Sequence, residues 1–271
     1  MNLSQCQSIT QIPDVSGAIN LRVLTLDRCH KVVRFNESIG FMQKLVCLSA
    51  SECTMLKSFV PSMYLPSLEV LSFNLCKRLE HFPEVIQKMD KPLKIWMIGT
   101  AVKRFPNSIG NLTGLEYIDM SFCRRLSDLS SSFFLLPKLD SLRIDGCSQL
   151  RKSFKRFKES HSVANGSSNL VTLYLSDANL SDQDLLTLLE CFPNLEDLNV
   201  SHNKFASLPK SIKGSLHLKS LDVSYCRSLK EIPELPLSIE KVDARYCESL
   251  TSKASSILWS KVSLLSPLFI C

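Results

Sequence analysis

The chain has 271 residues and a formal net charge of +6, and 45% of its residues are hydrophobic against 21% charged. This apolar content excludes a disordered chain, and eight glycines exclude a collagen-like one. Length alone favours about two domains. No stretch reaches the roughly 18 apolar residues that span a bilayer, and the N-terminus lacks a signal-peptide pattern. We therefore expect neither secretion nor membrane insertion.

A leucine pattern recurs along the whole chain. The full copies of the pattern L-x-x-L-x-L-x-x-C/N-x-L begin at Leu21, Leu45, Leu68, Leu115, Leu139, Leu195, Leu218 and Ile239. Two variant copies begin at Leu93 and Leu170, and one truncated copy begins at Leu3. Most starts lie two dozen residues apart, which is the period of the leucine-rich repeat.

This repeat predicts a fold. Its alternating leucines indicate a short strand with one apolar face, which becomes buried only when copies stack side by side. We predict an α/β leucine-rich repeat solenoid, with a curved parallel sheet on the concave face and mostly 3-10 or extended segments and few helices on the convex face. One helix is expected at 182–191, because Ser181 and Asp184 form an N-cap box before helically spaced leucines.

Cysteines occupy one position of the repeat, which we call the ninth column: Cys6, Cys29, Cys53, Cys76, Cys123, Cys147, Cys226 and Cys247. Asn203, Ala101 and Ala178 fill that column in other copies. We interpret the column as buried, reduced thiols, which implies an intracellular compartment. Disulfides between neighbouring members and a metal site are the alternatives, although zinc-ribbon C-x-x-C spacing is absent from the sequence.

Two columns of the repeat should supply the exposed side chains of the sheet. The fifth reads Thr25, Ser49, Ser72, Met97, Asp119, Arg143, Tyr174, Asn199, Asp222 and Asp243, and the eighth reads Arg28, Glu52, Leu75, Thr100, Phe122, Gly146, Asp177, His202, Tyr225 and Tyr246. Exposed aromatics among charges are typical of binding hot spots. We predict partner binding by a C-terminal cluster of Asp222, Tyr225, Asp243, Arg245 and Tyr246, and by a middle cluster of Asp119, Phe122 and Arg143. The alternative is that strands simply favour Tyr and Phe.

Basic residues follow the ninth column at equivalent places: Lys31, Lys77, Arg78, Arg124, Arg125 and Arg227. We predict that they form one edge that docks another domain. A solvated rim is the alternative, and nucleic acid is disfavoured because no stacking motif accompanies the charges.

Catalytic chemistry is not indicated. The histidines lie at unrelated repeat positions, and Cys29 and His30 should point to opposite sides of the chain, which excludes a productive nucleophile pair. No phosphate-binding G-x-x-x-x-G-K-[ST] occurs. We predict a protein that is not an enzyme and has no catalytic, cofactor or metal site.

The segments "GTAVKRFPNSIGNLTGLEYIDMSFCRRL" and "LKSLDVSYCRSLKEIPELPLSIEKVDARYCESLTS" resemble the repeats of plant TIR-NB-LRR disease-resistance proteins. The resemblance implies a protein-interaction module of an intracellular immune receptor, located in the cytoplasm and also in the nucleus. Its partners would be a pathogen effector or a guarded host protein, together with the receptor's own nucleotide-binding and TIR domains. The module would restrain the nucleotide-binding domain. Substrate-recognition repeats of an F-box ubiquitin ligase are the alternative, and a secreted repeat protein is a third.

The resemblance also sets the expected domains. We expect a repeat domain over residues 1–250, with about eleven repeats and a basic loop insertion at 151–169, and a tail over 251–271 that begins a truncated post-repeat region. Because Leu3 already holds the sixth position of the repeat, the chain begins inside a strand. We interpret the chain as a fragment, a truncated product or a sequence whose start is placed too late.

Overall fold

The structure is a computed structural model that describes residues 1–150 and 169–251. The chain divides into two compact units, Met1–Leu142 and Arg143–Cys271. The predicted loop at 151–169, except for its last residue, and the tail after residue 251 lie outside the described residues. The predicted boundary at residue 250 stays a prediction.

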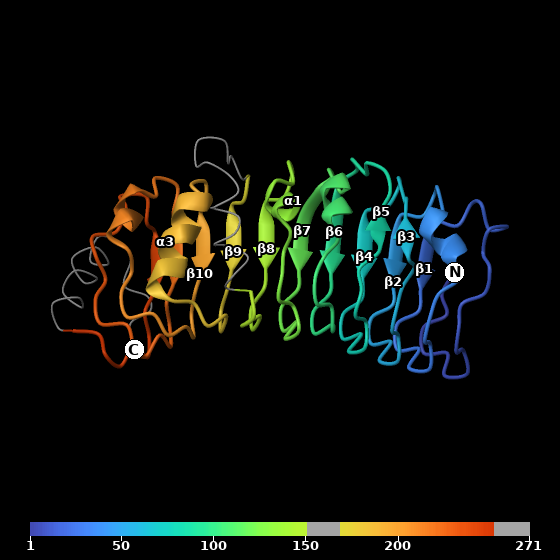
Figure 1. The fold of residues 1–271 in the computed structure, drawn as a ribbon, viewed down its shortest axis with the longest axis horizontal. Coiled ribbons are helices and arrows are strands. Elements are labelled where there is room, and N and C mark those ends of the chain that lie inside the picture. The colour runs from blue at the N-terminus through green and yellow to red at the C-terminus, as the bar shows by residue number, and fades with distance from the viewer. Residues whose placement is uncertain (151–168, 252–271) are drawn as a thin grey trace. The chain divides into compact units, whose positions relative to one another are not determined.

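Each unit is built on parallel strands that follow one another in chain order (Figure 1). The first unit contains β1 (Val23–Thr25), β2 (Cys47–Ser49), β4 (Val70–Ser72), β6 (Leu93–Trp96), β7 (Leu115–Asp119) and the start of β8 (Ser141–Arg143). The second contains β9 (Thr172–Tyr174), β10 (Asp197–Asn199), β11 (Ser220–Asp222) and β12 (Lys241–Asp243).

The leucines of the repeat stack into the core. Leu24 pairs with Leu48 and Leu48 with Leu71 in the first unit, and all three are fully buried. Leu198 pairs with Leu221 in the second unit, where both are at most 2% exposed. In-register stacking closes the apolar face that a single strand would leave in water. The predicted leucine-rich repeat solenoid is confirmed.

The return segments are mostly 3-10 or extended, as predicted. They include η1 (Glu37–Phe41), η2 (Asn107–Asn111), η4 (Lys210–Gly214), the short parallel pair of β3 (Ser62–Met63) with β5 (Glu84–Val85), and the one-turn helix α1 (Ser131–Phe134). Pro106 precedes η2 and Pro209 precedes η4, where the fixed proline φ suits entry into a helical turn. Few residues remain for the return in most repeats, and a 3-10 turn uses them economically.

Among the described residues, one helix is longer: α3 (Asp182–Cys191), which lies where the sequence predicts it. The side chain of Ser181 accepts from the backbone N–H of Asp184, while the Asp184 carboxylate accepts from the backbone N–H of Ser181 at 2.8 Å. This reciprocal cap satisfies two backbone donors at the helix start. Within this helix, Leu185 and Leu188 are buried.

One repeat corrects the sequence-based column assignment. Strand β6 pairs Leu93 with Leu115 but Trp96 with Asp119, so this repeat is one residue shorter than its neighbour. Trp96 therefore holds the fifth column in place of Met97. Gly99 then holds the eighth column, and Thr100 holds the ninth column in place of Ala101.

No helix in residues 1–150 and 169–251 is both long and apolar enough to cross a bilayer.

Candidate functional site

The eighth column has a left-handed backbone in every repeat that the structure describes. Its eleven residues have φ between +51° and +69°: Gln5, Arg28, Glu52, Leu75, Gly99, Phe122, Gly146, Asp177, His202, Tyr225 and Tyr246. For residues other than glycine this conformation costs on the order of 1–3 kcal/mol. Other interactions of the folded chain must therefore offset this free energy at each turn.

Hydrogen bonds between repeats offset this cost. The N–H of Arg28 donates to the carbonyl of Ser51 at 2.8 Å. The N–H of Tyr225 donates to the carbonyl of Arg245 at the same distance. Most of the left-handed residues thus direct their N–H groups at the next repeat. Their side chains are left pointing outward at the edge of the sheet.

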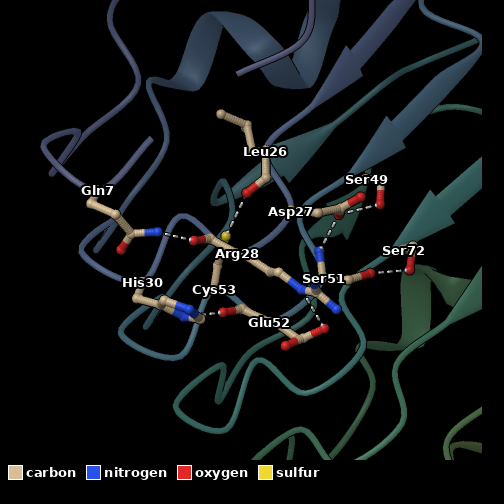
Figure 2. Close-up of polar contacts among 10 residues, drawn as sticks. All are labelled: Gln7, Leu26, Asp27, Arg28, His30, Ser49, Ser51, Glu52, Cys53 and Ser72. Atoms are coloured by element: carbon tan, nitrogen blue, oxygen red, sulfur yellow. Dashed lines mark hydrogen bonds and ion pairs between the residues drawn. The ribbon is translucent and has the colours of Figure 1, made fainter. Parts of the chain in front are cut away.

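The ninth column ties most repeats to the one before them. The thiol of Cys53 donates to the carbonyl of Leu26 at 3.1 Å (Figure 2), and that of Cys76 donates to the carbonyl of Ala50 at 3.0 Å. Asn203 makes the same link with its amide, which donates to the carbonyls of Leu175 and Val200 at 2.9 Å. A thiol and an amide therefore substitute for one another because both are small donors.

Burial keeps these thiols protonated. It raises the pKa of Cys53 to about 12 and that of Cys226 to about 12, and it raises the pKa values of Cys76 and Cys123 as well. Their protons are used in hydrogen bonds to carbonyls, in agreement with the reduced-thiol interpretation. A thiol with a raised pKa is a poor nucleophile and a poor metal ligand.

Side chains at the seventh column add a second link. The carboxylate of Asp27 accepts from the hydroxyl of Ser49 at 2.6 Å and from the backbone N–H of Ser51 at 2.8 Å (Figure 2). The hydroxyl of Ser51, also in the seventh column, lies 2.8 Å from the hydroxyl of Ser72 in the next repeat. These bonds satisfy turn donors and hold the exposed eighth column in a fixed geometry.

In the second unit the eighth column forms a stack of exposed aromatic rings, which we call the aromatic row: His202, Tyr225 and Tyr246. The centroids of His202 and Tyr225 lie 4.4 Å apart with planes at 9°, and those of Tyr225 and Tyr246 lie 4.5 Å apart with planes at 23°. Tyr246 is 59% exposed. The structure thus brings together two residues of the predicted C-terminal cluster and adds His202.

The charged residues of that cluster lie beside the aromatic row, but they already form hydrogen bonds within the protein. Asp222 is half-buried and accepts from the N–H of Ser224 at 2.9 Å. Asp243 accepts from both Nε and Nη2 of Arg245, the latter at 2.6 Å. Burial opposes ionisation of Asp243, but the hydrogen bonds from Arg245 outweigh it and lower the pKa of Asp243. Both carboxylates therefore mainly fix the turns that display the rings.

The first unit carries a second group, which we call the aromatic patch: Leu75 and Phe122 are exposed, and Trp96 and Tyr117 are half-buried. The rings of Trp96 and Tyr117 lie 5.5 Å apart, and Phe122 is 54% exposed. Sequence reasoning missed Trp96 because it counted one residue too far in the short repeat. Gly99 is the signal that could have found it, since glycine suits the left-handed column.

Two predicted residues of the middle cluster lie elsewhere than expected. Asp119 is only 6% exposed, and its carboxylate accepts from the N–H of Ser121 at 2.9 Å, so we correct its role from partner contact to turn cap. Arg143 belongs to the second unit, where its guanidinium lies 4.3 Å from the ring centroid of Tyr174. The hydroxyl of Tyr174 donates to Asp197 at 2.7 Å. Burial and this bond raise the pKa of Tyr174.

All six residues of the predicted basic edge are exposed. Lys77, Arg78 and Arg125 line one hollow in the first unit, whereas Arg227 pairs with Glu248 at 3.4 Å in the second unit. Lys31 and Arg124 also lie in the first unit but do not line the hollow, Lys31 in another repeat and Arg124 directly before Arg125. The structure therefore gathers half of the predicted edge into one place.

The described residues contain no group of three or more His, Cys, Asp or Glu side chains that could hold a metal ion. His30 bonds through Nδ1 to the carbonyl of Glu52 at 2.9 Å (Figure 2), and the thiol of Cys29 bonds to the carbonyl of Leu3. The two side chains thus take separate partners.

The chain is similar to known plant proteins. A family model described as "Disease resistance protein RPS4B-like, leucine-rich repeats" matches residues 64–236. TMV resistance protein N from Nicotiana glutinosa is 29% identical over 89% of this chain and 25% of its own length. Disease resistance protein RPS4B from Arabidopsis thaliana is 29% identical over 79% of this chain and 17% of its own length. This chain thus spans a quarter or less of these relatives.

Among solved structures, the leucine-rich repeat domain of the type III effector XCV3220 (XopL) is 16% identical, with a TM-score of 0.48. The alignment covers 87% of this chain and 73% of that one.

Proposed function

Because this chain belongs to the leucine-rich repeats of RPS4B-like disease resistance proteins, we propose that it recognises a pathogen effector or a guarded host protein. In this proposal the exposed side chains of the sheet make the contact, and the module restrains the nucleotide-binding domain of a full-length receptor until the partner arrives. A partner achieves such a release only by binding the released state more tightly than the restrained one.

The observation that carries the proposal is the aromatic row. Its tyrosine rings are exposed, stacked and held on left-handed backbone that most side chains disfavour. Rigid aromatic side chains lose little entropy on binding, and such residues dominate interface energetics. The aromatic patch offers a second anchor of the same chemistry in the first unit.

The proposed compartment is the cytoplasm, and the nucleus as a second location. Support comes from the ninth column, whose thiols bond to carbonyls and carry raised pKa values. Buried reduced thiols are typical of proteins in a reducing compartment.

Restraint of the nucleotide-binding domain is assigned to the basic edge. Lys31 and Arg124 are exposed and occupy the same turn of different repeats. Such charges steer and orient an acidic partner more than they add affinity. The F-box alternative rests on the helix-bearing repeat at α3, and the family match does not favour it.

The proposal is tested by comparing two forms of the chain as bait for proximity labelling in plant cells. One form is wild type and the other carries Tyr225→Ala and Tyr246→Ala. Proteins labelled by wild type are then purified and titrated against both forms. We expect the variant to bind at least about tenfold more weakly, because it lacks two central ring contacts.

A matched control removes two exposed leucines of the second unit, with Leu216→Ala and Leu237→Ala. This form should bind like wild type, and both variants should keep the wild-type circular dichroism spectrum. Partners that bind the tyrosine variant and wild type equally would remove the aromatic row as the recognition surface.

A further inference from the structure

A basic hollow of about 540 Å³ lies in the first unit, on the side of the repeats that follows the ninth-column turn. Three repeats, which begin at Leu45, Leu68 and Leu115, contribute to its lining, which consists of Lys57, Ser58, Lys77, Arg78, Glu80, His81 and Arg125. Backbone bridges join Ser58 to His81 across neighbouring repeats. The floor of the hollow is therefore part of the rigid solenoid.

The carboxylate in the hollow is already neutralised. Oε2 of Glu80 accepts from Lys103 at 3.1 Å, and Oε1 accepts from Arg125 at 3.2 Å. The bond from Lys103 is the largest influence that lowers the pKa of Glu80, so this group stays ionised at neutral pH. Each of its oxygens has a cation of its own, and it neutralises no further lysine or arginine.

The remaining cations have no such partner. Within residues 1–150 and 169–251, the side chains of Lys57, Lys77 and Arg78 form no ion pair. Like charges held together repel one another, and their repulsion is relieved by a bound anion. The four lining cations and one carboxylate leave the hollow with a formal charge of 4 − 1 = +3.

We propose that this hollow binds a small ligand that carries two or more phosphate groups. Each such group brings about −1.5 to −2 charges at neutral pH, so two groups match the uncompensated charge. The fork of Arg78 and the ammonium groups of the lysines suit phosphate oxygens. The volume falls within the range of small-molecule sites, which is about 300–1,000 Å³. The inference does not depend on effector recognition.

The test is a calorimetric titration of the whole chain with pyrophosphate at about 0.15 M salt, where long-range attraction between exposed charges is screened. We expect saturable binding of one equivalent. Lys77→Ala with Arg78→Ala should weaken binding by about tenfold or more, since it removes two of the unpaired cations. Glu80→Gln should strengthen binding, because Lys103 and Arg125 are then released to the ligand.

A matched control removes two exposed lysines outside the hollow, with Lys204→Ala and Lys210→Ala. It has the same net charge as the test variant and should bind like wild type. Thermal unfolding midpoints should stay close together in all forms because every changed side chain is at the surface. If the alanine pair lowers the midpoint, Lys77→Gln with Arg78→Gln replaces it.

Three results would show that the hollow is not a phosphate site. They are no saturable binding by wild type, equal weakening in the control, and a hexaglutamate peptide that binds more tightly than pyrophosphate. The last result would assign the hollow to an acidic protein segment. Inorganic phosphate that binds as tightly as pyrophosphate would disprove the requirement for two groups.

Discussion

The hydroxyl of Thr100 lies 3.2 Å from the thiol of Cys123, and both residues are buried. Cys123 also donates to the carbonyl of Met97 at 3.1 Å. These contacts place Thr100 in the ninth column, beside the cysteine of the next repeat. They also fix Gly99 in the left-handed eighth column, with Leu75 in the repeat before it.

Gly99→Ala is expected to destabilise the protein by about 1–2 kcal/mol, because a Cβ is disfavoured in left-handed backbone. The added atom would also lie 3.2 Å from Cδ2 of Leu75 at a φ of +68°. Chemical denaturation measures the loss. Gly17→Ala is the control, since open space surrounds that position, and an equal effect at both glycines would contradict the assignment.

Leu221→Ala should cost about 2–5 kcal/mol, because it leaves a cavity between stacked repeats. Leu221 is 1% exposed and pairs with Leu198 on one side and Val242 on the other. Leu216, which is 75% exposed, provides the matched control, and Leu216→Ala should change the free energy of unfolding by less than about 0.5 kcal/mol. Equal denaturation curves for the two variants would be incompatible with the inward stacking.

Stability should fall as pH rises from 9 to 12. The thiols of Cys53 and Cys226 have the ordinary pKa of 9.0 in the unfolded chain and a pKa of about 12 in the folded protein. In this window the unfolded state has released protons that the native state keeps, so rising pH favours unfolding. Below pH 9 both states are protonated and the contribution is constant.

The measurement is the denaturation midpoint across that pH range for wild type and for Cys53→Ala with Cys226→Ala. The variant should lose less stability between pH 9 and 12, since it lacks the two groups that titrate differently in the two states. Parallel curves would show that these thiols do not titrate with raised pKa values.

Under the proposed domain docking, Lys31→Glu with Arg124→Glu should weaken association with the nucleotide-binding domain of a full-length receptor while leaving the repeats folded. Both residues lie on the basic edge outside the hollow, so the pair separates domain docking from anion binding. Co-precipitation of the two parts, expressed as separate chains, is the readout. Lys204→Glu with Lys210→Glu has the same net charge, and a similar loss in that control would indicate bulk charge rather than a specific edge.

The sequence was sufficient for the repeat, the parallel strands and the α3 helix. Its leucine spacing and the cap formed by Ser181 and Asp184 are local signals, and a stacked core is the only way to bury a leucine on every strand. It also predicted that the ninth column holds buried, reduced thiols. The reason is that Asn203 shows which chemistry that position needs.

The tertiary structure decided which side chains remain available to a partner. Asp119 and Phe122 are three residues apart in one repeat, yet one is buried as a turn cap and the other is 54% exposed. Burial depends on the neighbouring repeat, where Trp96 takes the place that counting gave to Met97. Contacts between repeats also gathered Lys57, Lys77 and Arg125 around one hollow. Column counting treats each repeat separately, so it could not place charges from several repeats together.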